Sequence, residues 1–220
     1  MTLPAAAASL ASPAGAGLFV ALEGGDGAGK TTQARLLGDW LGTRGREVVL
    51  TREPGGTALG RVLREALLHG EDLDARTEAL LFATDRAHHV HSLVRPALAR
   101  GAVVVTDRYI DSSVAYQGGA RGLGEQEVRD LSLWATRGLM PHVTVVLDLD
   151  PAAAAARRAG APDRLEREAA AFHERVRAHF LAAAGAEPAR YLLVDAAQAP
   201  DDVHAAIRAR LAPLLAGGAA

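Results

Sequence analysis

The chain has 220 residues, a formal net charge of −2 and no cysteine. The length predicts one domain with a substantial core, the nearly balanced charge argues against a nucleic-acid partner, and the lack of cysteine excludes disulfides and thiolate chemistry. The apolar runs are too short to span a bilayer, so we expect no membrane partner and a cytoplasmic location. Residues 1–17 are rich in Ala, Ser, Pro and Gly, with no basic residue before their apolar part. This composition predicts a flexible N-terminal extension rather than a secretory signal.

Strand-like and helix-like segments alternate over residues 18–216, which predicts a single domain there. Short apolar runs predict strands at Phe19–Leu22, Val48–Thr51, Ala102–Thr106, Thr144–Leu149 and Tyr191–Val194. Helical patterns lie between them, at about 30–44, 58–68, 76–99, 125–137, 166–184 and 201–215. Continuous apolar strands joined by long crossovers favour an α/β fold with a five-stranded parallel sheet and helices on both faces. Ligands of such sheets bind beyond the carboxyl ends of the strands.

The first predicted strand leads into a loop that matches G-x-x-x-x-G-K-[ST], the P-loop pattern. The loop reads Gly24, Gly25, Asp26, Gly27, Ala28, Gly29, Lys30 and Thr31, with Thr32 following. Glycines allow backbone N–H groups to surround a polyphosphate, and the N-terminus of the next helix adds a favourable dipole. Lys30, the only lysine of the chain, would reach the β- and γ-phosphates, and the Thr31 hydroxyl would ligate Mg²⁺.

Two further segments carry candidate binding residues but do not identify a site by themselves. Arg52 ends the second predicted strand, beside Glu53 and a Pro-Gly-Gly turn, where a solvated Arg–Glu pair on the surface is the simpler interpretation. Phe82 and Arg86 share one face of a predicted helix, so the ring could stack on a nucleobase while the guanidinium bonds its edge. Taken alone, a core phenylalanine and a solvated arginine would explain the same pattern.

Polar residues are dense after the third predicted strand. An apolar strand that ends in an aspartate, here Asp107, is the Walker-B pattern whose carboxylate supports Mg²⁺. Arg108 adds a guanidinium, and Ser113, Tyr116 and Gln117 add hydroxyl and amide groups. Together with the P-loop upstream, this density favours a binding site over a simple loop.

Residues of about 156–166 contain helix breakers and the arginines Arg157, Arg158 and Arg164. We expect a short mobile lid that brings positive charge to a transferring phosphoryl group and excludes water. An exposed basic loop paired to Glu166 and Glu168 is the alternative.

Four motifs together resemble those of bacterial thymidylate kinases. They are Glu23-Gly24-x-Asp26-Gly27-Ala28-Gly29-Lys30-Thr31-Thr32, Arg52-Glu53-Pro54-Gly55-Gly56-Thr57, Leu81-Phe82-Ala83-x-Asp85-Arg86, and Asp107-Arg108-Tyr109 with Ser112, Tyr116 and Gln117. The match runs in order from about Leu18 to Leu215. It implies a three-layer P-loop NTPase fold, a homodimer, ATP and Mg²⁺ as cofactors, and transfer of the γ-phosphate of MgATP to dTMP, which yields dTDP for dTTP biosynthesis.

The resemblance also implies roles for individual residues. Those implied to bind dTMP are Asp26, Arg52, Phe82, Arg86, Arg108, Ser113, Tyr116 and Gln117. Phe82 would stack on thymine with Arg86 at its edge and Ser113 and Gln117 nearby, Arg52 and Arg108 would hold the phosphate, and Tyr116 would lie against the sugar and disfavour a 2′-hydroxyl. Asp26 would lie near the 3′-hydroxyl and the acceptor phosphate, and Thr31 and Asp107 near the metal.

The groups implied to act in catalysis are Lys30, Asp26, Arg108, Arg157, Arg158 and Arg164. Some family members carry an arginine inside the P-loop, but the variable positions here are Gly25, Asp26, Gly27 and Ala28. The lid arginines are therefore the candidates for the extra positive charge.

Two other functions fit parts of the sequence. A kinase for another nucleotide or nucleoside would share the P-loop, although Arg52 and Arg108 argue for a monophosphate acceptor. A non-enzymic GTPase switch would need an Asn-Lys-x-Asp motif, and the chain has no asparagine and no second lysine.

Overall fold

The computed structural model describes residues 17–157 and 161–216, and the predicted N-terminal extension lies almost entirely outside them. One parallel sheet of five strands, in the order β2-β3-β1-β4-β5, forms the centre of the fold. The strands are β1 (Leu18–Glu23), β2 (Val48–Arg52), β3 (Val103–Asp107), β4 (Val143–Asp148) and β5 (Tyr191–Asp195). The predicted parallel sheet is confirmed, with strand ends within about one residue of the expected ones.

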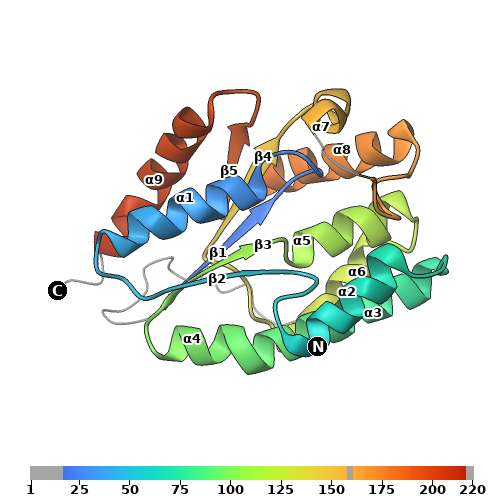
Figure 1. The fold of residues 1–220 in the computed structure, drawn as a ribbon, viewed down its shortest axis with the longest axis horizontal. Helices are drawn as coiled ribbons and strands as arrows, with labels where there is room; N and C mark the ends of the chain where they lie inside the picture. The colour runs from blue at the N-terminus through green and yellow to red at the C-terminus, as the bar shows by residue number, and fades with distance from the viewer. Residues whose placement is uncertain (1–16, 158–160, 217–220) are drawn as a thin grey trace.

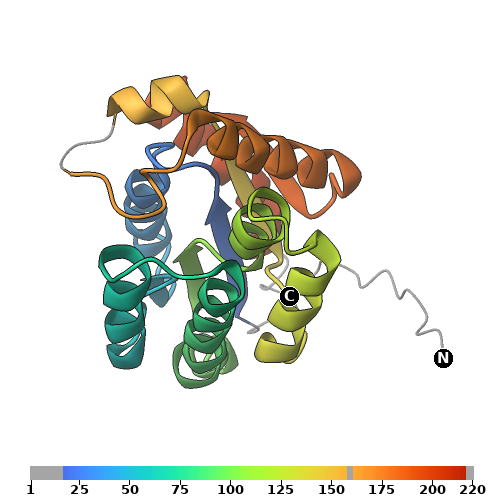
Figure 2. The same ribbon diagram turned by 90° about the vertical axis from the view of Figure 1, so that its right-hand side faces the viewer.

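Helices cover both faces of the sheet (Figures 1 and 2). They are α1 (Lys30–Gly42), α2 (Ala58–His69), α3 (Ala75–His89), α4 (Arg95–Ala99), α5 (Ile110–Ser113), α6 (Glu125–Thr136), α7 (Pro151–Arg157), α8 (Ala170–Ala186) and α9 (Pro200–Ala216). Two π-helical segments are η1 (Val90–Val94) and η2 (Val114–Ala120). Of the described helices, none is both long and apolar enough to cross a membrane.

The central strands are apolar on both sides because helices bury both faces. All six residues of β1 are buried, and so are the valines of β3 and β4. The edge strands are half exposed: Leu50 of β2 and Leu193 of β5 retain 47% and 48% of their accessible surface. Buried central strands hold the loops at their carboxyl ends in fixed positions.

Helical structure differs from the sequence expectation in four places, one of which is α7, where no helix was predicted. The stretch predicted as one helix over 76–99 is continuous but passes through η1 between α3 and α4. Residues 110–120, where no helix was predicted, form α5 and η2, and π-helical turns of this kind are frequent at functional sites. The helix expected from residue 166 begins only at Ala170, because the Asp163 carboxylate accepts from the N–H groups of Leu165 and Glu166 and holds a turn there.

Candidate active site

The P-loop connects β1 to α1, and its glycines are required by the backbone. Gly24, Gly27 and Gly29 have φ of 130°, 86° and 94°. A Cβ atom at Gly24 would lie 2.4 Å from the carbonyl oxygen of Leu147, and one at Gly27 would lie 2.4 Å from that of Ala154. A side chain at either position would therefore be strained twice, by its own dihedral and by the neighbouring backbone.

Lys30 folds back over this loop. Its Nζ donates to the carbonyl oxygens of Gly24 at 3.1 Å and Gly25 at 2.7 Å. The side chain is buried, and burial together with the nearby charge of Arg108 lowers the pKa of the ammonium. Among the described residues, the hydrogen-bond acceptors of this ammonium are neutral carbonyls, so it is well placed to turn toward phosphate oxygens.

The two predicted metal ligands lie side by side. The Thr31 hydroxyl donates to Oδ2 of Asp107 at 2.8 Å, because β1 and β3 are neighbours and Leu22 is in register with Asp107. A hydroxyl and a carboxylate are hard oxygen donors of the kind that Mg²⁺ prefers. Among the described residues there is no cluster of three or more His, Cys, Asp or Glu side chains that could hold a metal without further ligands. The pair therefore fits Mg²⁺ that is shared with phosphate oxygens and water.

Asp26, Arg108 and Tyr116 form one hydrogen-bonded cluster between the P-loop and η2. Arg108 donates a short hydrogen bond to Asp26, and the Tyr116 hydroxyl donates to the other oxygen of Asp26 at 3.0 Å. Burial raises the pKa of Asp26, but the charges of Arg108 and Lys30 and these hydrogen bonds outweigh it and hold that pKa well below its usual range. Asp26 is therefore a carboxylate at any physiological pH.

The backbone of Arg108 is as constrained as its side chain. Its φ of 72° is unusual for a residue with a Cβ, and the conformation is held by a bond from its N–H to Leu22 and one from the Thr106 hydroxyl to its carbonyl. The guanidinium also donates to the carbonyl of Gly24 at 3.1 Å and to Ser112 Oγ at 2.9 Å. Arg108 therefore lies against the P-loop, with which it shares hydrogen bonds through Gly24 and Asp26.

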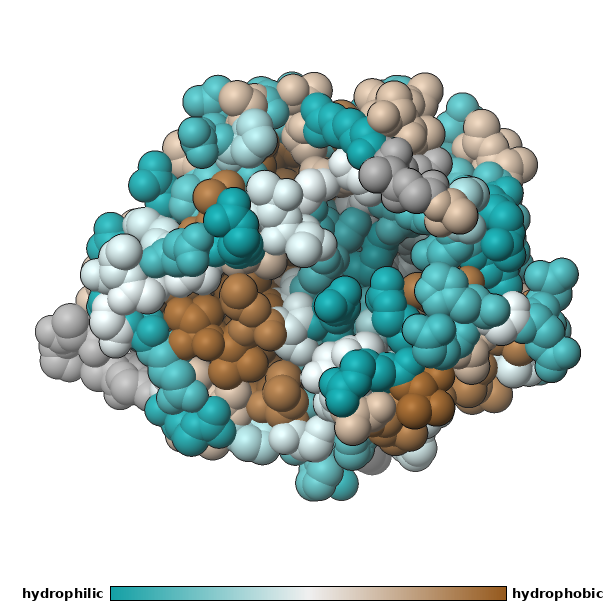
Figure 3. Space-filling model, viewed as in Figure 1, coloured by the Kyte–Doolittle hydropathy of each residue, from teal (hydrophilic) through white to brown (hydrophobic). Residues whose placement is uncertain are grey.

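A cavity of about 70 Å³ lies beside this cluster. Its lining includes Asp26, Pro54, Arg64, Leu68, Phe82, Arg86, Arg108, Ser113, Tyr116 and Gln117. Figure 3 shows hydrophilic side chains gathered around a hollow on this face of the molecule. The residues that the resemblance assigned to the base are therefore brought to one place.

Arg86 is fully buried in this wall, so the alternative of a solvated arginine is wrong. Its Nε donates to Glu53 at 2.7 Å, one terminal nitrogen donates to Ser132 at 3.1 Å, and the other donates to the Tyr109 carbonyl and to Ser113 Oγ. A guanidinium has five N–H groups, so one remains for a ligand.

Three arginines surround the opening next to the P-loop, a space of about 300 Å³. Arg52 is exposed at this opening, at the end of β2, where it is in register with Asp107. Arg108, which follows β3, also lines the opening. Arg64 of α2 is the third, anchored by a 3.0 Å bond to the carbonyl of Pro54. Sequence reasoning missed Arg64, since its only signal is a basic residue in the helix that follows a candidate strand end.

Glu53 is a second residue that sequence reasoning missed. It does not pair with Arg52, as the alternative interpretation required, but is buried and accepts from Arg86 and from Nδ1 of His89, both at 2.7 Å. The peptide bond from Glu53 to Pro54 is cis. Glu53 therefore orients the guanidinium of Arg86 through this buried hydrogen bond.

The arginines of the predicted lid do not share one environment. Arg158 lies outside the described residues. Arg157 donates to the carbonyl of Ala196 at 2.8 Å. Arg164 is buried, donates to the Leu67 carbonyl at 2.8 Å and pairs with Glu78 at 2.7 Å. The expectation of a mobile flap is therefore wrong for Arg164, which anchors its segment to α2 and α3.

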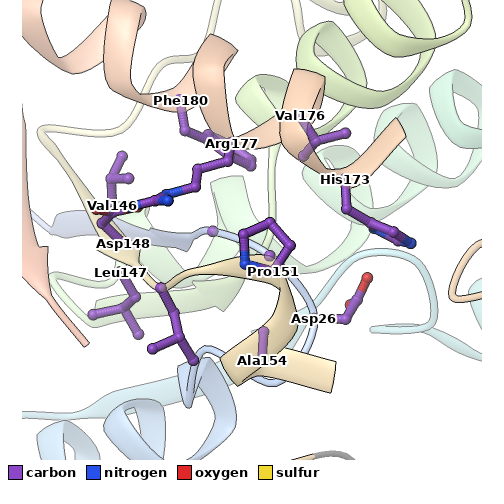
Figure 4. Close-up of a pocket in the computed structure, with 13 residues that line it drawn as sticks. Asp26, Val146, Leu147, Asp148, Pro151, Ala154, His173, Val176, Arg177 and Phe180 are labelled. Carbon is purple, nitrogen blue, oxygen red and sulfur yellow. Dashed lines mark hydrogen bonds and ion pairs between the residues drawn. The ribbon is translucent and has the colours of Figure 1, made fainter. Parts of the chain in front are cut away.

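A smaller cavity, of about 30 Å³, lies on the other side of the P-loop against α8 (Figure 4). Its lining includes Asp26, Leu147, Pro151, His173, Val176 and Phe180. Arg177 closes one end through two bonds to Asp148, at 2.6 and 3.0 Å. The space is large enough for a water molecule.

Comparison with known proteins identifies the family. The family model for thymidylate kinase matches residues 22–207. The chain is 59% identical to a thymidylate kinase of Clavibacter michiganensis over 92% of this chain and 98% of the relative, and 53% identical to one of Bifidobacterium longum over 90% and 98%. A crystal structure of thymidylate kinase from Ehrlichia chaffeensis superposes with a TM-score of 0.74 at 32% identity, covering 90% of this chain and 99% of that one. The chain therefore belongs to the thymidylate kinase family.

Proposed function

We propose that the protein transfers the γ-phosphate of ATP, with Mg²⁺, to dTMP and releases dTDP and ADP. One observation carries the proposal: Asp26, Arg64 and Arg108 line both the opening next to the P-loop and the cavity with Phe82 and Arg86. A donor triphosphate on the P-loop and an acceptor base in the cavity would therefore bring two phosphates together at these residues. Family membership supports the same reaction.

The chemistry needs neutralisation of charge more than reactive side chains. Both phosphates are anionic and must approach in line, so positioning and electrostatic stabilisation supply most of the rate. Lys30 would leave the carbonyls of Gly24 and Gly25 for the β- and γ-phosphates, and the magnesium ion held by Thr31 and Asp107 would neutralise charge between them. Arg52, Arg64 and Arg108 would hold the acceptor phosphate.

The base and sugar would be held by the cavity that Phe82 and Arg86 line. Phe82 would stack on the base, and the remaining N–H of Arg86 would donate to its edge. Tyr116, whose hydroxyl is bonded to Asp26, would contact the sugar. Asp26, held as a carboxylate, would accept from the 3′-hydroxyl. Extra charge from the lid would come from Arg157 or Arg158, since Arg164 is already ion-paired.

The test is ADP release from MgATP with each monophosphate offered in turn. We expect strong turnover with dTMP, weaker turnover with dUMP and little with dCMP, dGMP, AMP or thymidine. Turnover with thymidine but not dTMP would overturn the phosphate role of the three arginines. Turnover with a different monophosphate alone would favour the alternative of another nucleotide kinase.

We also propose a homodimer formed through α2, α3 and α6, which lie side by side (Figure 2). These helices expose large apolar side chains: Val62 is 66% exposed, Leu80 56% and Trp134 81%. Apolar surface of this kind is typical of an interface. Light scattering should give twice the chain mass for the protein and the single mass for a Val62→Glu, Trp134→Glu variant; a wild-type protein that runs as a monomer would contradict the proposal.

A further inference from the structure

The side-chain amide of Gln117 can face the cavity that Phe82 and Arg86 line in only one orientation. Its Nε2 donates to Oε1 of Glu78 at 2.8 Å. A carboxylate accepts hydrogen bonds and cannot donate them, so the amide NH₂ must point at Glu78 and the amide oxygen must point away. No described residue donates to that oxygen, and it is not among the buried polar atoms that lack a partner, so it is accessible from the cavity that Gln117 lines.

Glu78 is held in place so that it cannot turn away from the amide. Its carboxylate is fully buried at the start of α3. Arg121 donates to both of its oxygens, at 3.3 and 3.2 Å, and Arg164 pairs with Oε2 at 2.7 Å. Two guanidinium groups therefore hold the carboxylate of Glu78 in place beside the amide.

Residues 78, 82 and 86 follow one another at intervals of one helical turn, so they share a face of α3. Phe82 and Arg86 both line the cavity, and Arg86 has one N–H left for a ligand. The cavity thus presents an obligatory donor from Arg86 and, through Glu78, an obligatory acceptor from Gln117, together with the Phe82 ring, which can stack on a base.

We propose that Glu78 determines which base the site accepts by fixing the amide of Gln117 with its oxygen toward the cavity. Thymine and uracil offer a carbonyl acceptor at position 4 and an N–H donor at position 3, which match this pair. Cytosine offers an amino donor at position 4 and an unprotonated ring nitrogen, an acceptor, at position 3. The donor of Arg86 would then face a donor, and the amide oxygen of Gln117 would face an acceptor. Sites built on buried polar groups reject such mismatches strongly. Glu78 is a positioning residue in this account, and the inference rests on the proposed function.

The experiment compares kcat/KM for dTMP and for dCMP in Glu78→Gln. A glutamine at position 78 can accept or donate, so the amide of Gln117 is free to turn and present NH₂ to the base. We expect the dTMP-to-dCMP ratio to fall at least tenfold. Glu65→Gln is the matched control, since it makes the same substitution at an exposed glutamate of α2, and its ratio should stay within about twofold of the wild type.

A double-mutant cycle shows whether Glu78 acts through Gln117. Gln117→Leu should lower the ratio by itself, and adding Glu78→Gln to it should change the ratio no further. An undiminished effect of Glu78→Gln in the Gln117→Leu background, or an unchanged ratio in the folded single variant, would overturn the inference. If Glu78→Gln does not fold, Glu78→Asp serves instead, since it withdraws the carboxylate by one methylene and keeps its charge. Failure of the proposed function would differ, because the wild type itself would then show no turnover with dTMP.

Discussion

Arg86→Met tests how much of the fold depends on a buried guanidinium. The change removes four hydrogen bonds and leaves Glu53, which is 3% exposed, with His89 as its remaining side-chain partner. Leaving one member of a buried ion pair uncompensated costs about 3–5 kcal/mol. For a domain of this size each kcal/mol lowers Tm by roughly 2–4 °C, so we expect a fall of about 6–20 °C.

Calorimetry and urea unfolding, both without nucleotide, measure this effect. Arg76→Met is the matched control, because it makes the same substitution on the same helix at an exposed side chain, and its Tm should change by no more than about 2 °C. Adding Glu53→Gln to Arg86→Met should restore part of the loss, since it removes the uncompensated charge. An Arg86→Met variant that unfolds with the midpoint of the wild type would refute the reasoning.

Three further predictions concern the P-loop and its neighbours. Burial and the nearby Asp111 raise the pKa of Glu23 to about 7, so between about pH 4.5 and 7 the folded state holds a proton that the unfolded state has lost, and the free energy of unfolding should fall as pH rises. In urea titrations, Glu23→Gln should reduce this dependence of the free energy of unfolding on pH by up to about 1.4 kcal/mol per pH unit. A variant with the same pH dependence as the wild type would contradict the prediction. Gly27→Ala should abolish measurable ATP binding in calorimetry, because its Cβ would meet a backbone carbonyl at 2.4 Å; retained affinity would show that the loop can shift. Thr31→Ala should raise the Mg²⁺ concentration for half-maximal turnover at least about tenfold, and an unchanged requirement would remove Thr31 from the metal site.

The fold was largely predictable because its signals are local. Buried parallel strands have continuous apolar runs, and the P-loop pattern fixes where β1 ends and α1 begins. Helices in the segment 110–120 were missed because glycines and polar residues interrupt the apolar pattern there, and η2 is held by its packing against α6 and α8 rather than by periodicity.

Sequence motifs were enough to predict which residues lie at the site, but not which side chains pair with one another there. Position at strand ends was enough to place Asp107 and Arg108, since register brings the ends of neighbouring parallel strands together. Partners could not be assigned in the same way: Glu53 stands next to Arg52 in sequence and yet bonds Arg86, thirty-three positions away. Adjacency in the chain favours the wrong pair because successive residues of an extended segment point to opposite sides.

The contrast between Arg157 and Arg164 follows from what each arginine can reach. Both were expected on one basic flap, where neighbouring glutamates were the only partners visible in the sequence. Glu168 instead bonds Arg121 at 2.6 Å, and Arg164 pairs with Glu78, eighty-six positions upstream. Because Glu78 also holds Gln117, the segment after the lid and the amide proposed to read the base share one carboxylate. Movement of the segment that carries Arg164 would therefore shift Glu78 and, through it, the amide of Gln117. Substitutions at Arg164 should accordingly alter nucleotide selectivity as well as stability.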